Sequence, residues 1–170
     1  IFVFLPLTCG SYFLAKKIFP SKIWLRNLIL LVFSLFFYAW GEPLYVFLML
    51  LSISINFLFG FLFEKNKCSK LLFIISIIFN LSFLIVFKYT GFYIQNINTL
   101  FNLSINVPQI TLPIGISFYT FQALSYIIDV YRKKVDAQKN YLNLALYISL
   151  FPQLIAGPIV RYTDIQKEIE

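Results

Sequence analysis

The sequence contains no histidine and few charged residues. Only 12% of its 170 residues are Asp, Glu, Lys or Arg, whereas 60% are hydrophobic and 20% are aromatic. A soluble domain carries about 25% charged residues, so this chain has too little polar surface to coat a water-soluble globule. The composition therefore excludes a cytosolic enzyme, a secreted disulfide scaffold and a disordered tail, and it predicts a protein embedded in a lipid bilayer.

The absence of histidine and the small number of cysteines limit the chemistry that these residues can perform. Histidine is the commonest general base and the commonest metal ligand, so its absence removes both from the chain. The two cysteines, Cys9 and Cys68, lie far apart without the spacing of metal ligands. We therefore expect neither a metal site nor a disulfide framework.

Long uncharged runs predict an all-α, polytopic transmembrane protein, because a spanning helix needs about 20 mostly apolar residues. About six membrane segments are expected: Ile1–Ala15, Ile23–Trp40, Pro43–Phe63, Leu71–Phe87, Leu112–Val130 and Tyr141–Val160. The connection Lys88–Thr111 carries apolar residues at helical spacing. This spacing favours a short helix lying in the membrane interface rather than another span.

The basic residues alternate from loop to loop. The loops after the first, third and fifth segments hold 11 of the 14 Lys and Arg residues, whereas the opposite loops contain only Lys88. Because cytoplasmic loops are enriched in Lys and Arg, this pattern predicts an N-terminus outside and three basic loops in the cytoplasm. It also explains the net charge of +7 without a nucleic-acid partner.

The fifth segment carries a polar stripe. Five residues share one helical face because they recur at spacings of three, three, one and three positions: Tyr119, Gln122, Ser125, Tyr126 and Asp129. Lipid penalises such a face, so it should point into the protein or toward a water-filled cavity. The alternative is that these groups hydrogen-bond neighbouring helices, with Asp129 pairing with Arg132 or Lys133.

The sixth segment is uncharged but should be broken twice, at Pro152 and at the pair Gly157 and Pro158. Gln153 follows the first break, and Arg161 follows the second. Non-helical backbone at membrane depth is tolerated only where it is buried in protein or lines a water-filled cavity. Two interpretations stay open: a plain proline kink at a helix end, or a re-entrant element beside a substrate path.

These two segments also carry a resemblance to known proteins. It rests on the runs LPIGISFYTFQALSYIIDVYR (Leu112–Arg132) and FPQLIAGPIVRY (Phe151–Tyr162), preceded by SLFFYAWGEP (Ser34–Pro43) and FKYTGFY (Phe87–Tyr93). In type and order, these runs closely resemble the membrane-bound O-acyltransferase superfamily. The nearest match is its bacterial branch of alginate O-acetylation-type membrane proteins, and the resemblance covers nearly the whole chain.

The resemblance implies an O-acyltransferase of the bacterial inner membrane that transfers acetyl groups from a cytoplasmic donor toward an extracytoplasmic polysaccharide. It implies acetyl-CoA as the acyl donor, no bound cofactor, and an extracytoplasmic partner protein that completes delivery. The family fold is a ring of helices around a central funnel. The residues expected to line this funnel are Tyr119, Gln122, Ser125, Tyr126, Asp129, Gln153 and Arg161.

The chain departs from the family in one respect. The catalytic histidine of the family lies downstream of the GPIVRY block, and these 170 residues contain no histidine. We therefore expect residues 1–170 to be the N-terminal part of a single O-acyltransferase domain, truncated before its catalytic region and inactive alone.

Other functions remain open at this point. A related enzyme moves D-alanine toward teichoic acids and shares much of this region. A transporter segment is a further alternative, because broken helices near the membrane midplane build substrate sites in transporters. A truncated product without function is the third. A buried histidine in a following helix would support acyl transfer, whereas an inverted copy of the six spans would support transport.

Overall fold

The computed structural model describes residues 3–65, 70–108, 110–157 and 160–169, and all regular structure within these ranges is helical. The all-α prediction is therefore confirmed for these residues. The elements, in chain order, are α1 (Phe4–Ile18), α2 (Ile23–Gly41), α3 (Tyr45–Lys65), α4 (Lys70–Leu84), the π-helical turn η1 (Ile85–Tyr89), α5 (Thr90–Phe101), α6 (Ile116–Tyr131), α7 (Tyr141–Ser149), α8 (Phe151–Ala156) and α9 (Tyr162–Ile169).

Three helical stretches of the described residues are long and apolar enough to cross a membrane: Ile23–Gly41, Tyr45–Lys65 and Lys70–Phe101. They correspond to the second, third and fourth predicted segments. The helices at the other predicted segments are shorter, with 15 residues in α1, 16 in α6 and 9 in α7. The count of about six membrane segments therefore stays a prediction.

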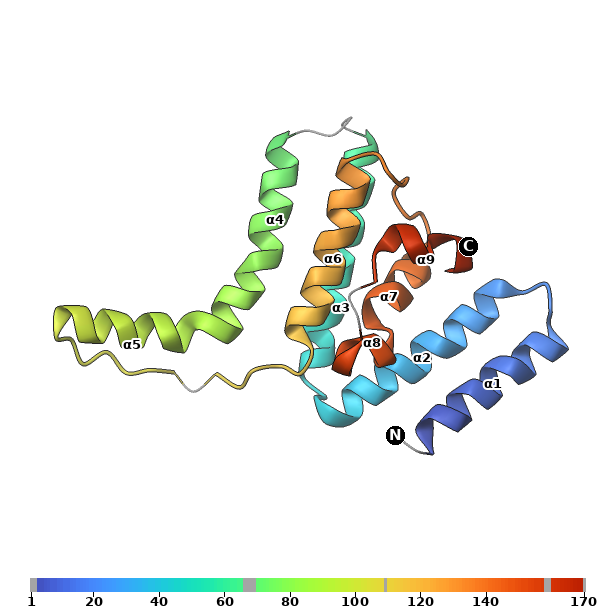
Figure 1. Cartoon of the computed structure of the whole chain (residues 1–170), viewed down its shortest axis with the longest axis horizontal. Coiled ribbons are helices and arrows are strands. Elements are labelled where there is room, and N and C mark those ends of the chain that lie inside the picture. Colours follow the sequence, from blue (N-terminus) through green and yellow to red (C-terminus); the bar gives the residue numbers. More distant parts are fainter. Residues whose placement is uncertain (1–2, 66–69, 109, 158–159, 170) are drawn as a thin grey trace.

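The stretch Lys70–Phe101 changes direction at the π-helical turn η1. The wider π turn disturbs the regular α ladder, and the Thr90 hydroxyl donates to the carbonyl oxygen of Val86 at 2.7 Å. Figure 1 shows α5 leaving the axis of α4 and extending away from the other helices. Near the end of α5, the side chain of Asn98 both donates to and accepts from the backbone of Ile105. These two bonds fold the chain back after the helix.

Helices α3 and α4 are joined by a reciprocal amide pair. Asn56 donates to the side-chain oxygen of Asn80 at 2.9 Å, and Asn80 donates back at 2.8 Å. Each amide also donates to the carbonyl oxygen four residues earlier, Ser52 for Asn56 and Ser76 for Asn80. Both asparagines are fully buried. This pair fixes the rotation and register of two apolar helices that hydrophobicity alone would leave free to slide.

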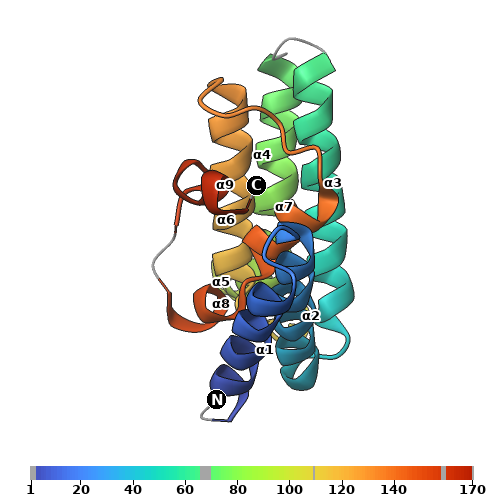
Figure 2. The same cartoon turned by 90° about the vertical axis from the view of Figure 1, so that its right-hand side faces the viewer.

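Helix α6 is the central element of the fold. It packs against α3 and α4 and also against α7, α8 and α9. Figure 1 shows α6 alongside α3, and in Figures 1 and 2 the short C-terminal helices lie against α6 and α2. The fifth predicted segment is therefore buried within the described chain along much of its length, which places its polar residues among helices.

We predict that replacing one asparagine of the amide pair costs more stability than replacing both. Asn80→Leu should lower the free energy of unfolding by about 1–2 kcal/mol, because Asn56 is left buried without its partner. The double variant Asn56→Leu with Asn80→Leu should recover part of that loss. Unfolding in detergent, followed by circular dichroism, measures both.

The control is Asn96→Leu, which makes the same chemical change at an exposed asparagine of α5 whose amide bonds only within its own helix. Equal costs for Asn80→Leu and Asn96→Leu, or strictly additive costs in the double variant, would contradict a coupled pair.

Candidate functional site

Two residues of the polar stripe of α6, Gln122 and Tyr126, contact the C-terminal helices. Tyr119, Gln122, Tyr126 and Asp129 are buried, and Ser125 is half-buried. Helix α6 begins after Gly115, whose φ of +75° is a backbone conformation that glycine adopts without strain. A side chain at Gly115 would also press against the carbonyl oxygen of Leu154 in α8. The turn before α6 thus lies directly against the broken segment.

A side-chain contact joins the two segments that the sequence singled out. The amide nitrogen of Gln122 in α6 donates to the amide oxygen of Gln153 in α8. Gln122 is buried and Gln153 is half-buried. The side-chain oxygen of Gln122 is buried and has no hydrogen-bond partner among the described residues. This pair is therefore only partly satisfied by the surrounding helices.

The break in the sixth segment falls two residues before Pro152. Helix α7 ends at Ser149, Leu150 is non-helical, and Pro152 occupies the first turn of α8, where its missing N–H is not needed. The free N–H of Phe151 donates to the hydroxyl of Ser34 in α2 at 3.3 Å. The break is thus satisfied by protein rather than left open at membrane depth.

The second predicted break is described only in part. Helix α8 ends at Ala156, and Gly157 is extended, with φ −81° and ψ 157°. A Cβ at this position would lie 2.7 Å from the Cα of Gln153, so the close approach requires glycine. Pro158 lies outside the described residues. Arg161 is exposed and precedes α9, so the structure does not bring it into the buried contacts of the stripe.

Three buried tyrosines, which sequence reasoning missed as a group, tie α6 to α7 and α9. The ring of Tyr162 lies edge-on to Tyr126 and to Tyr147, with centroids 5.0 Å and 5.1 Å apart. The Tyr147 hydroxyl donates to the carbonyl oxygen of Val160 at 2.8 Å. Tyr162 belongs to the FPQLIAGPIVRY block, but Tyr147 lies outside the blocks, and no spacing pattern connects the two.

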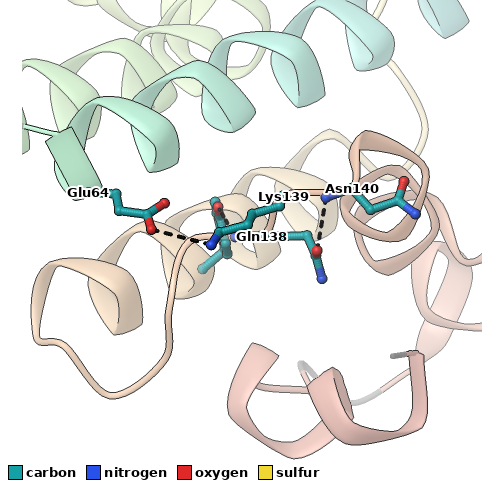
Figure 3. A network of polar contacts seen from close by, with 5 residues as sticks. Glu64, Gln138, Lys139 and Asn140 are labelled. Carbon is teal, nitrogen blue, oxygen red and sulfur yellow. Dashed lines mark hydrogen bonds and ion pairs between the residues drawn. The ribbon is translucent and has the colours of Figure 1, made fainter.

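The loop between α6 and α7 is anchored to this tyrosine cluster by Gln138. Its backbone N–H donates to the Tyr126 hydroxyl at 3.1 Å, and its side-chain amide donates to the Tyr162 hydroxyl at 2.8 Å. Figure 3 shows Gln138 beside Asn140, with Lys139 directed toward Glu64 of α3 at 3.7 Å. Gln138 therefore ties the loop to the tyrosine cluster, and an exposed ion pair joins the loop to the end of α3.

Asp129 lacks the basic partner expected if the stripe only joined neighbouring helices. One carboxylate oxygen of Asp129 is buried without a hydrogen bond, and within the described residues it forms no ion pair with Arg132 or Lys133. Tyr119 and Thr120 on the same helix also carry buried hydroxyls without partners there. The structural alternative therefore accounts for Tyr126 and for one bond of Gln122, but not for Asp129 or Tyr119.

The stripe does not line the large cavity of the structure. That cavity, with a volume of about 770 Å³, is formed by α1, α2, Ile114 and Leu154. In the part of the chain that the structure describes, no three His, Cys, Asp or Glu side chains come close enough to share a metal ion. What α6 offers is an array of buried hydroxyl, amide and carboxylate groups, which can hold and orient a polar ligand.

Comparison with known proteins identifies the family. The chain is 36% identical to the "Probable alginate O-acetylase AlgI" of Pseudomonas aeruginosa, over 97% of the chain and 32% of that relative. It is 31% identical to the "Peptidoglycan O-acetyltransferase" of Helicobacter pylori, over 100% of the chain and 37% of that relative. The chain belongs to the family of these O-acetylases. This confirms the resemblance to membrane-bound O-acyltransferases of the alginate O-acetylation type.

The match has a defined extent. The chain spans about a third of the length of the curated relatives that it matches. No family model matches the chain. No solved structure matches it. Together with its apolar helices, the family makes the chain part of a multi-pass membrane protein, and the two blocks that carry the resemblance are the two that meet at Gln122 and Gln153.

We predict that Gly60→Ala destabilises the packing of α3 on the stripe. A methyl group at Gly60 would collide with the Tyr126 hydroxyl and come within 3.0 Å of the ring carbon Cζ. The free energy of unfolding should fall by about 1–3 kcal/mol, as measured by thermal unfolding in detergent. Gly10→Ala is the control, because a Cβ there meets no atom within 4 Å.

A second variant identifies the obstacle. Tyr126→Phe removes the hydroxyl, so Gly60→Ala should cost less in that background than in the native chain. If the cost is the same in both backgrounds, the hydroxyl is not what Gly60 accommodates.

Proposed function

We propose that this chain forms part of a membrane-embedded O-acetyltransferase that transfers acetyl groups from a cytoplasmic donor toward an extracytoplasmic polysaccharide. The names of the relatives support this class. They refer to O-acetylation and to two acceptors, alginate and peptidoglycan, both of which contain sugar hydroxyls. Neither name refers to D-alanyl transfer or to transport, so these two alternatives have less support.

The observation that carries the proposal is the contact between Gln122 and Gln153. It brings together the two sequence blocks of the family, one a helix with a polar face and the other a broken helix. Both features are costly in a bilayer unless they serve a polar environment. We therefore assign the lining of a central funnel to Tyr119, Gln122, Ser125, Tyr126, Asp129 and Gln153. Arg161 is added on its permanent charge and its position after the second break, since it lies outside the buried contacts of the stripe.

The chemistry divides between these residues and others. Transfer of an acetyl group to a sugar hydroxyl needs a base that takes the hydroxyl proton and donors that stabilise the developing oxyanion. The 170 residues contain no histidine, so the family's histidine base has to come from outside them. Their role is then to bind and orient: hydroxyls and amides along α6 hold polar groups of the substrate. Acetyl-CoA is the donor in this proposal, and a partner protein completes delivery outside the membrane.

We predict that Arg161→Leu reduces O-acetylation without reducing the amount of protein. Arg161 is exposed, so its loss should leave the fold intact, whereas its permanent charge can bind an anionic part of a substrate. The test uses cells in which the gene for this protein has been deleted. Reintroducing the native gene should restore O-acetyl groups on the polysaccharide, and the Arg161→Leu gene should restore several-fold fewer O-acetyl groups than the native gene. Acetate released by mild base measures this.

The matched control is Arg132→Leu, which removes an exposed arginine at the end of α6 that is not assigned to the funnel. If both variants restore full O-acetylation, Arg161 does not act in the reaction. If the gene deletion leaves O-acetylation unchanged, the proposed function itself is wrong.

The alternation of basic loops predicts a topology that labelling can test. With Cys9 and Cys68 replaced by serine, a cysteine at Lys134 should react with an impermeant maleimide only from the cytoplasmic side, and one at Asn96 only from the outer side. Both positions are exposed, and only the first lies in a basic loop. Labelling of both from the same side would contradict the proposed orientation.

A further inference from the structure

A cavity of about 770 Å³ opens between the start of α1 and the end of α2. Leu154 of α8 and Tyr38 are buried at its inner wall, whereas Leu7, Phe36 and Trp40 are more than half exposed around it. Its volume lies within the range of small-molecule sites, about 300–1,000 Å³. The cavity is thus a lateral opening in the surface of the helix pair, next to the broken segment.

One wall of the cavity is formed by packed aromatic rings. The ring of Phe4 in α1 lies edge-on to Phe151 of α8, with centroids 5.2 Å apart, and is tilted against Phe37 of α2 at the same distance. These rings fix the start of α1 against α2 and α8, which lie side by side in Figure 1. The wall of the cavity is therefore part of the packed structure.

The lining has two chemically different ends. Nearly all of it is hydrocarbon or aromatic, and α2 is one of the helices long and apolar enough to cross a membrane. At the end of α2 the lining passes through Trp40 and Gly41 to Glu42, its one charged residue. Glu42 as a residue is half-buried, and its side chain forms no hydrogen bond or ion pair with the described residues.

We propose that this cavity binds a membrane lipid with an ammonium headgroup. The apolar lining at membrane depth takes a hydrocarbon chain, and the unpaired Glu42 carboxylate at the end of α2 meets the ammonium group. Charge complementarity selects this class, because the lining contains no Lys or Arg to receive an anionic headgroup. The lipid rests against the turn before α6 and against α8 through Ile114 and Leu154.

The test measures bound lipid. The protein is purified in mild detergent from membranes containing phosphatidylethanolamine and phosphatidylglycerol, and the retained lipids are quantified by mass spectrometry. Phosphatidylethanolamine should be enriched several-fold over its share of the membrane. Glu42→Gln should abolish the enrichment, whereas Glu168→Gln, at an exposed glutamate, should not. If the native protein retains phosphatidylethanolamine and phosphatidylglycerol in the same ratio as the membrane contains them, the proposal is wrong.

Two glycines give a matched pair for filling the cavity. A Cβ at Gly41 or at Gly10 meets no atom within 4 Å, so both positions accept a larger side chain, but only Gly41 lines the cavity. Gly41→Phe should reduce bound phosphatidylethanolamine several-fold, and Gly10→Phe should not, with circular dichroism checking that both variants fold. Equal losses in the two variants would overturn the proposal.

A crosslink distinguishes lipid from protein as the occupant. Benzoylphenylalanine in place of Phe36 should give adducts with lipid on irradiation. If it gives adducts with protein alone, the cavity is a protein interface and the lipid assignment is wrong. Because the readout is lipid, the outcome is independent of O-acetylation. Lipid binding without acetyl transfer would count against the proposed function only.

Discussion

The structure depends on the need of buried polar groups in an apolar chain to find partners in protein. Hydrocarbon offers no hydrogen bonds, so each amide or free backbone group at membrane depth costs free energy until another residue satisfies it. Asn56 and Asn80 solve this problem by pairing between α3 and α4. Asn27 of α2 does so by donating to Asn143 of α7 and to the carbonyl oxygen of Ile169 at the end of α9. The same few groups therefore decide which apolar helices are neighbours.

Much of the helical layout could be predicted because hydrophobic length is a direct signal of a membrane helix. The second segment was expected at Ile23–Trp40, and α2 covers Ile23–Gly41. The π-helical turn after Leu84 could not be predicted, since the apolar run continues into it as far as Phe87. The break before Pro152 was expected from the proline, but its position at Leu150 depends on Ser34, which is more than a hundred residues away in the chain. Helix α9 was missed because its eight residues form less than a membrane span.

The sequence showed which residues of α6 share a face, but not what that face meets. Spacing grouped Gln122 with Tyr126, and no local pattern indicates that the first contacts Gln153 while the second contacts Gln138 and Tyr162. These are tertiary contacts between side chains on different elements. For the same reason the large cavity was not predicted, because it forms where α1 and α2 diverge beside α8.

The polar stripe of α6 has two explanations, contact between helices and the lining of a substrate path, and they predict different hydrogen bonding. A face that only joins helices should be satisfied by them, as the Asn56 and Asn80 pair is. Helix α6 instead carries buried, unpartnered oxygens on Tyr119, Thr120, Gln122 and Asp129 within the described structure. Burial of such groups without partners costs about 1–3 kcal/mol each, so they are retained against a stability cost. Helix contact among the described residues therefore does not account for these oxygens, whereas the lining proposed for a substrate path gives them polar groups to bind.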